Sequence, residues 1–198
     1  MIRIVVSLVL LVSAWQSFTV LAGGTLHRMV MQELEGRADI AFAIERLQLA
    51  LRIDPGNPSL LSLLARLQPP AESLTTLRLH AKVAPADPEV WAGIFSAKMR
   101  LGELDSESRS AIDAAIQLGP YEPLVAERLV DAGSRRWLLL DAYTRQQIVE
   151  MAVRALESRA EFRKVEIGKL LASRGLLDMV CTSVRVAERE VCGQSASQ

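Results

Sequence analysis

The sequence predicts an all-α protein, an α-solenoid of helical hairpins with a helical C-terminal cap, preceded by an N-terminal transmembrane or signal helix. Three observations support this fold class: an uncharged apolar stretch at the N-terminus, helical periodicity beyond residue 24 with almost no strand alternation, and a Pro-x-x-Pro motif that occurs three times. With 50% apolar and 23% charged residues, the 198-residue chain is too apolar to be disordered. We expect residues 1–24 to be a membrane anchor or signal peptide, 25–133 to form the repeats and 134–198 to form the cap.

The N-terminal stretch is long enough to cross a membrane. Ile4–Leu26 contains no charged residue, and fourteen of the nineteen residues from Ile4 to Ala22 are apolar. Nineteen helical residues reach about 28 Å, close to the hydrocarbon thickness of a bilayer. We therefore expect an uncleaved anchor, with a signal peptide cleaved after Ala22 as the main alternative and a buried core helix as a further one.

Basic residues flank this stretch on both sides, so charge alone does not fix the orientation of the helix in the membrane. The length of the segment before Ile4 decides our expectation. Arg3 favours a cytoplasmic N-terminus, whereas Arg28 and Arg37 oppose it. A very short tail before a first apolar helix favours N-in, and the excess of Arg over Lys, 19 against 4, fits a bacterial coding background. We expect a single-pass inner-membrane protein with its soluble domain in the periplasm, or a periplasmic protein if the signal is cleaved.

The first helix after the anchor is expected from Ala38 to Ile53. Its apolar residues follow the i, i+3, i+4, i+7 spacing that lines one helical face. They are Ile40, Ala43, Ile44, Leu47, Ala50 and Leu51.

The three proline pairs mark the ends and beginnings of later helices. They are Pro55/Pro58, Pro85/Pro88 and Pro120/Pro123, at separations of 30 and 35 residues. Asn57 and Asp87 each offer an N-cap side chain, and the proline that follows suits the first helical position because its missing N–H is not needed there. Glu122 before Pro123 is a weaker cap. Such a period predicts a repeat architecture.

Helices joined by these proline pairs resemble the tetratricopeptide repeat, whose period is about 34 residues. The resemblance covers roughly residues 25–133 and implies two or three repeats. The residues that carry it are Asp87–Trp91, Ile94 and Leu101-Gly102 for a first helix and its turn, and Ala43, Leu47, Ala50 and Pro55 for a second helix. The chain departs from the pattern at Phe95, where the family usually has Gly, at His80, where it has Ala, and at Pro69-Pro70, which shortens the middle repeat.

Residues 134–198 continue as helices without the period. Asp141 is expected to cap a helix with an apolar face of Ile148, Met151, Ala152, Ala155 and Leu156. A second helix is expected from about Ala160 to Ser173, followed by Gly175 in the C′ position, and a third from Leu176. Inward positions of the second helix are Phe162, Val165 and Leu170, and Trp137-Leu138-x-Leu140 is expected to fill the core before the cap. A solenoid needs such a closing cap with a polar outer face.

The two cysteines, Cys181 and Cys192, are eleven residues apart. On one continuous helix they would lie about 16 Å apart, too far for a disulfide, whose Cα atoms lie within about 7 Å. If the domain is exported and the helix ends between them, we expect a disulfide; two unpaired thiols near a frayed end are the alternative.

Composition gives little support for catalysis or for a nucleic-acid partner. The 23 Lys+Arg balance 23 Asp+Glu, with no basic run longer than Arg135-Arg136, so nucleic acid is not an expected partner. Two His and two Cys are too few for a usual zinc site, and no Gly-rich phosphate loop occurs. His27 and His80 lie in no nucleophile motif and are interpreted as structural. We expect no catalytic residue, cofactor, metal or small-molecule substrate.

The resemblance to tetratricopeptide repeats implies a groove that binds a protein partner. The inward first-helix positions of that family fall here on Ser59, Ser62, Arg66, Glu89, Ser96, Glu127 and Asp131. The alternative interpretation is that these residues form only the solvent face of the helices. We expect a non-enzymatic, membrane-anchored adaptor of the bacterial cell envelope. The layout also resembles the small accessory proteins of bacterial exopolysaccharide biosynthesis and export. The alternative is a periplasmic chaperone-like holder or a structural subunit of a secretion or cytochrome-maturation assembly.

Overall fold

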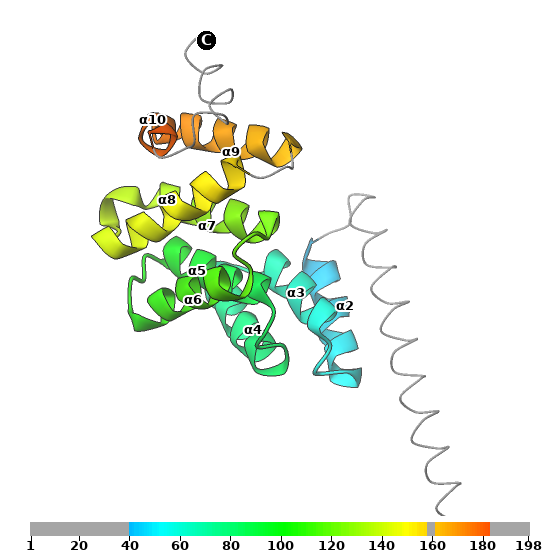
Figure 1. The fold of residues 1–198 in the computed structure, drawn as a ribbon. Coiled ribbons are helices and arrows are strands. Elements are labelled where there is room, and N and C mark those ends of the chain that lie inside the picture. The colour runs from blue at the N-terminus through cyan, green and yellow to red at the C-terminus, as the bar shows by residue number, and fades with distance from the viewer. Residues whose placement is uncertain (1–39, 158–160, 183–198) are drawn as a thin grey trace, which may run out of the picture. The chain divides into compact units, whose positions relative to one another are not determined.

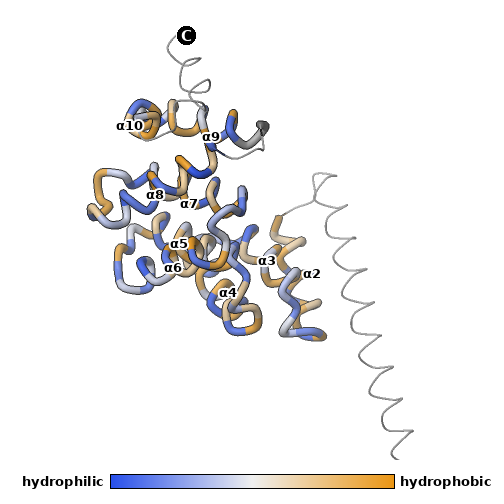
Figure 2. Tube along the Cα trace, viewed as in Figure 1, coloured by the Kyte–Doolittle hydropathy of each residue, from blue (hydrophilic) through white to orange (hydrophobic). Residues whose placement is uncertain are grey.

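The computed structural model describes residues 40–157 and 161–182, and every secondary-structure element within them is a helix (Figure 1). The all-α prediction is thereby confirmed for these residues. The chain divides into two compact units, residues 1–83 and 84–198. Hydrophobic and hydrophilic residues alternate along most of the helices, as expected where one face of a helix is buried (Figure 2).

The first unit contains three described helices, α2 (Ile40–Ile53), α3 (Pro58–Leu67) and α4 (Pro70–Val83). Helix α3 contacts both α2 and α4. The small side chains Ala43 and Ala50 flank Leu47 on α2, and this face packs on Leu60 and Leu64 of α3. The predicted helix is confirmed over residues 40–53, while residues 38 and 39 lie outside the described residues, and Ile40 is exposed. Its burial was expected from periodicity alone, but it is the first residue of the described helix.

The second unit contains α5 (Pro88–Leu101), α6 (Ser106–Leu118), α7 (Pro123–Arg135), the 3-10 turn η1 (Trp137–Leu139), α8 (Ala142–Leu156), α9 (Glu161–Ser173) and α10 (Leu177–Cys181). Sequential helices pack in pairs, α5 with α6, α7 with α8 and α9 with α10. The first members of successive pairs also touch, since α5 contacts α7 and α7 contacts α9. The helices therefore form packed hairpins with contacts between neighbouring hairpins.

All three proline pairs join two helices through the same turn. The N–H of the residue before the second proline donates to the carbonyl three residues earlier: Asn57 to Asp54 at 3.3 Å, Asp87 to Ala84 at 3.2 Å and Glu122 to Gly119 at 3.2 Å. The next residue, Pro58, Pro88 or Pro123, then begins α3, α5 or α7, as predicted.

The caps at these helix starts differ as the sequence predicts. The Asn57 side chain accepts from the N–H of Leu60, and that of Asp87 accepts from the N–H of Glu89. Glu122 makes no side-chain cap hydrogen bond, which confirms its weaker role.

The helical segments expected after residue 134 are confirmed, with corrections in the side chains that they bury. Asp141 caps α8, and the predicted apolar face of α8 is buried. Helix α9 ends at Ser173, and Gly175 follows with φ +67°, a conformation that favours glycine. Val165 is exposed, so its inward assignment is wrong, and Phe162 lies outside the residues whose side chains are described.

Trp137-Leu138-x-Leu140 does not fill the core as a unit. Leu140 is buried, but Leu138 and Leu139 are exposed. The turn η1 leads the chain from α7 to α8 over the surface, so only Leu140, directly after the turn, reaches the interior.

Several predicted features lie outside the described residues, among them Ile4–Ala22, His27 and Cys192. Within the described ranges, no helix is long and apolar enough to cross a membrane. Cys181, at the end of α10, is disulfide-bonded. Its pairing with Cys192 stays a prediction here, because Cys192 is not described.

Candidate protein-binding surface

The residues predicted to line a groove fall on three helices that begin alike. Because α3, α5 and α7 each start with a proline, equivalent positions can be counted from Pro58, Pro88 and Pro123. The predicted residues occupy the second, fifth and ninth positions only. They are Ser59, Ser62 and Arg66 on α3 of the first unit, and Glu89 and Ser96 on α5 with Glu127 and Asp131 on α7 of the second unit. We call the four residues on α5 and α7 the repeat-helix face.

On α3, in the first unit, the three predicted residues reach solvent. Ser59 and Arg66 are exposed, and Ser62 is half-buried. The opposite side of α3 supplies the buried leucines Leu60 and Leu64. The amphipathic pattern of α3 thus leaves this polar stripe accessible.

On α5 and α7, which pack side by side, the four members of the repeat-helix face are half-buried. Ser96 and Asp131 occupy the same position of their helices, eight residues after the proline that begins each helix. The fifth position of α5 is Ala92, which is fully buried, so α5 contributes no polar side chain there. Helix α5 contacts α7, so these polar residues lie on two adjacent helices.

Arginines from α7 balance two of the acidic members. Arg128 donates from Nη1 to the carbonyl oxygen of Glu89 at 2.9 Å, and its Nη2 lies 3.7 Å from the Glu89 carboxylate. Arg135 pairs with Asp131 at 3.0 Å, one helical turn away. The face therefore presents carboxylates whose charge is already partly compensated, a feature that sequence spacing did not reveal because Glu89 and Arg128 are 39 residues apart.

The connection from α5 to α6 is built around Lys98, a charged residue that sequence analysis did not single out. Its side chain is 3% exposed, and Nζ lies 2.9 Å from Glu103, 2.5 Å from Asp105 and 2.8 Å from Glu107. Burial alone would lower the pKa of Lys98, but hydrogen bonds to these carboxylates outweigh it and hold the pKa above its usual value. The hydrogen bond from Lys98 also lowers the pKa of Asp105, with a further contribution from the N–H of Ser108. Because Asp105 is also the N-cap of α6, this cluster fixes where α6 begins.

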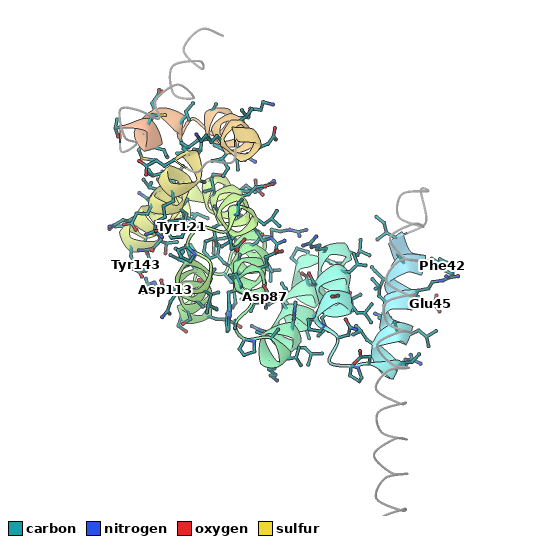
Figure 3. All side chains as sticks on the ribbon, turned by 45° about the vertical axis from the view of Figure 1, so that its right-hand side comes forward. Phe42, Glu45, Asp87, Asp113, Tyr121 and Tyr143 are labelled. Atoms are coloured by element: carbon teal, nitrogen blue, oxygen red, sulfur yellow. The ribbon has the colours of Figure 1, made fainter. Side chains whose placement is uncertain are left out.

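Polar contacts join α6 to the start of α8. The Arg109 guanidinium pairs with Asp141, the N-cap of α8. The pKa of Asp141 is lowered first by the N–H of Thr144 and then by Arg109. Tyr143 donates to Asp113 at 2.7 Å, and Figure 3 labels both residues in this region. The same hydrogen bond raises the pKa of Tyr143. These contacts hold two neighbouring hairpins in register.

Of the two histidines interpreted as structural, the structure describes His80, which is buried in α4. No group of three or more His, Cys, Asp or Glu residues within 40–157 and 161–182 could hold a metal ion.

We compared the sequence with protein families and with curated proteins. No protein-family model matches the sequence, and no curated protein matches it. The geometry of the helices and their polar faces is thus the basis for inferring what the chain does.

Proposed function

We propose that the protein is a non-enzymatic adaptor of the bacterial cell envelope, anchored in the inner membrane by Ile4–Ala22, whose repeat-helix face binds a protein partner. The proposal includes a tetratricopeptide-like solenoid of two or three repeats. It is supported by the repeated proline turn and by contacts of α7 with both α5 and α9. In such solenoids the first helices of successive hairpins line the concave surface.

The observation that carries the proposal is the side-by-side packing of α5 and α7 with polar residues at matching positions. Ser96 and Asp131 stand at the same helical position, and Glu127 lies one turn before Asp131. Half-buried polar side chains on rigid helices suit the recognition of an extended peptide or a partner helix, because few rotamers are lost on binding.

Anchoring gives such a surface a function without catalysis. A partner held at the membrane meets other components of the assembly at a raised local concentration. On the resemblance to accessory proteins of exopolysaccharide biosynthesis, we propose surface-polysaccharide synthesis or export as the process that the adaptor serves.

Site-specific photo-cross-linking in cells tests the proposal. A photoreactive amino acid at Ser96 or Glu127 should give a few defined cross-linked proteins. The control position is Gln117, which is exposed on α6 and outside the repeat-helix face. The same products at Gln117 would contradict the face assignment, and a broad smear at all positions would favour the chaperone-like holder.

A charge-reversal variant tests the contribution of the acidic residues. Glu127→Lys with Asp131→Lys should remove the defined cross-links from Ser96 while the helical circular dichroism stays unchanged, since exposed i,i+4 pairs contribute only about 0.3–0.5 kcal/mol to stability. Retention of every cross-link would exclude these carboxylates from the binding surface.

A further inference from the structure

The turn η1 between α7 and α8 presents two adjacent leucines to solvent. Leu138 is 87% exposed and Leu139 is 58% exposed, whereas the flanking Trp137 is half-buried and Leu140 is buried. Single exposed apolar residues are ordinary on protein surfaces, but two neighbouring leucines beside a half-buried tryptophan form a small apolar tip.

The tip is held in one conformation by an arginine. Arg145 of α8 donates from Nε to the carbonyl oxygen of Trp137 at 3.1 Å and from Nη2 to that of Leu138 at 3.2 Å. Its guanidinium also lies 5.8 Å from the centre of the Trp137 ring. The N–H of Leu139 donates to the carbonyl of Arg136 at 2.8 Å, and that of Leu140 to Trp137 at 3.3 Å. These carbonyls and N–H groups therefore have partners within the protein.

Basic residues flank the tip in the sequence. Residues 131–145 contain Arg135, Arg136 and Arg145 against Asp131 and Asp141, a net charge of +1, and Arg135 pairs with Asp131. Arg136 is exposed, and its Nε donates to the Met99 carbonyl, which fixes the base of its side chain against α5. Leucines flanked by arginines in the sequence and next to a tryptophan have the composition of a segment that enters the headgroup region of a bilayer.

We propose that the tip Leu138–Leu139 inserts into the interface of an anionic phospholipid membrane and gives the helical domain a membrane contact of its own. The carbonyls of Trp137 and Leu138 already accept hydrogen bonds from Arg145, so they enter the interface with partners. The positive charge complements lipid phosphates. A second copy of the chain would present the same positive charge and is disfavoured.

The chain is expected to be anchored through Ile4–Ala22, so insertion of the tip would be a second membrane contact. The contact would hold the repeat-helix face in a defined orientation to the membrane. The inference rests on the geometry of η1 and does not require the adaptor function.

Fluorescence of a dansyl amino acid placed at position 138 tests the insertion. The full chain is reconstituted into vesicles of phosphatidylcholine and phosphatidylglycerol, and quenching by spin-labelled phospholipid is compared with quenching by aqueous iodide. The control carries the probe at Tyr121, which is 85% exposed and lies before the start of α7 rather than after its end. Both positions are highly exposed, so neither probe should disturb folding, which circular dichroism verifies.

We expect the probe at 138 to be quenched by a spin label placed about 5–10 Å inside the headgroup boundary and shielded from iodide, and the probe at 121 to show the reverse. With the probe at 139, Leu138→Asp should lower the ratio of inserted to free tip about tenfold or more, the factor associated with burying a leucine. Quenching by iodide at 138 overturns the proposal, whether or not the anchor holds the chain on the vesicle. Shielding from iodide without quenching by lipid overturns it in favour of a protein contact.

Discussion

Replacing Lys98 by methionine should destabilise the second unit by removing the charge at the centre of the α5–α6 connection. Methionine keeps the length and the apolar stem of lysine but offers no donor, so the variant isolates the ammonium. In the folded protein that ammonium contacts three carboxylates, from Glu103, Asp105 and Glu107, which are themselves 34–49% exposed.

The magnitude follows from the number of contacts and their exposure. Hydrogen bonds to charged groups contribute about 1.5–3 kcal/mol each, but water screens partly exposed partners, which lowers each to about 1 kcal/mol. The three contacts then sum to about 3 kcal/mol, and removing the desolvation cost of a buried ammonium offsets part of this. We expect Lys98→Met to lower the free energy of unfolding by about 2 kcal/mol.

Urea unfolding followed by circular dichroism measures this difference. The matched control is Lys82→Met, because Lys82 is exposed at the end of α4 and its replacement should change stability by less than about 0.5 kcal/mol. If Lys98→Met is as stable as Lys82→Met, with an unchanged dependence on urea concentration, the cluster contributes nothing net and the reasoning is refuted.

The remaining predictions concern acid stability, helix packing and capping. The pKa of Asp105 is lowered in the folded state, so its contribution is complete above about pH 4 and is lost as pH falls through the folded pKa; below pH 4 the wild type should lose more stability in urea unfolding than Asp105→Asn, and parallel losses would contradict this. Gly133→Ala should cost about 1–3 kcal/mol by thermal unfolding, because its Cβ would lie 2.7 Å from Cγ1 of Ile148, and an unchanged melting temperature would show that α8 shifts freely. Asp141→Ala should cost about 1 kcal/mol or more, while Glu122→Ala, which removes no side-chain cap, should cost little; equal effects would exclude capping as the cause.

Local chemistry made the helix boundaries predictable. An Asn or Asp cap followed by a proline at the first helical position involves contacts within four residues of chain. Pro58 and Pro88 therefore mark helix starts whatever the tertiary packing around them. The glycine after α9 and the Asp141 cap were predictable for the same reason.

For the candidate surface, the sequence indicated only which positions along each helix to consider. Counting from the prolines locates the second, fifth and ninth residues of each helix, but the sequence does not say which side chains meet. Arg128 and Glu89 are 39 residues apart and come together because α5 packs on α7. The pairing lowers the charge of a face that sequence alone describes as acidic and polar.

Burial was the property that only the tertiary structure decided. Trp137-Leu138-x-Leu140 is apolar enough for a core, yet the path of the chain between α7 and α8 leaves Leu138 and Leu139 in solvent. Lysine is usually exposed, yet Lys98 is buried, and its ammonium pairs with three carboxylates five to nine residues further along the chain. Helix starts and ends depend on hydrogen bonds within one turn of chain and are encoded locally. Burial depends on which helices pack together, and packed helices also make contacts between residues thirty positions or more apart.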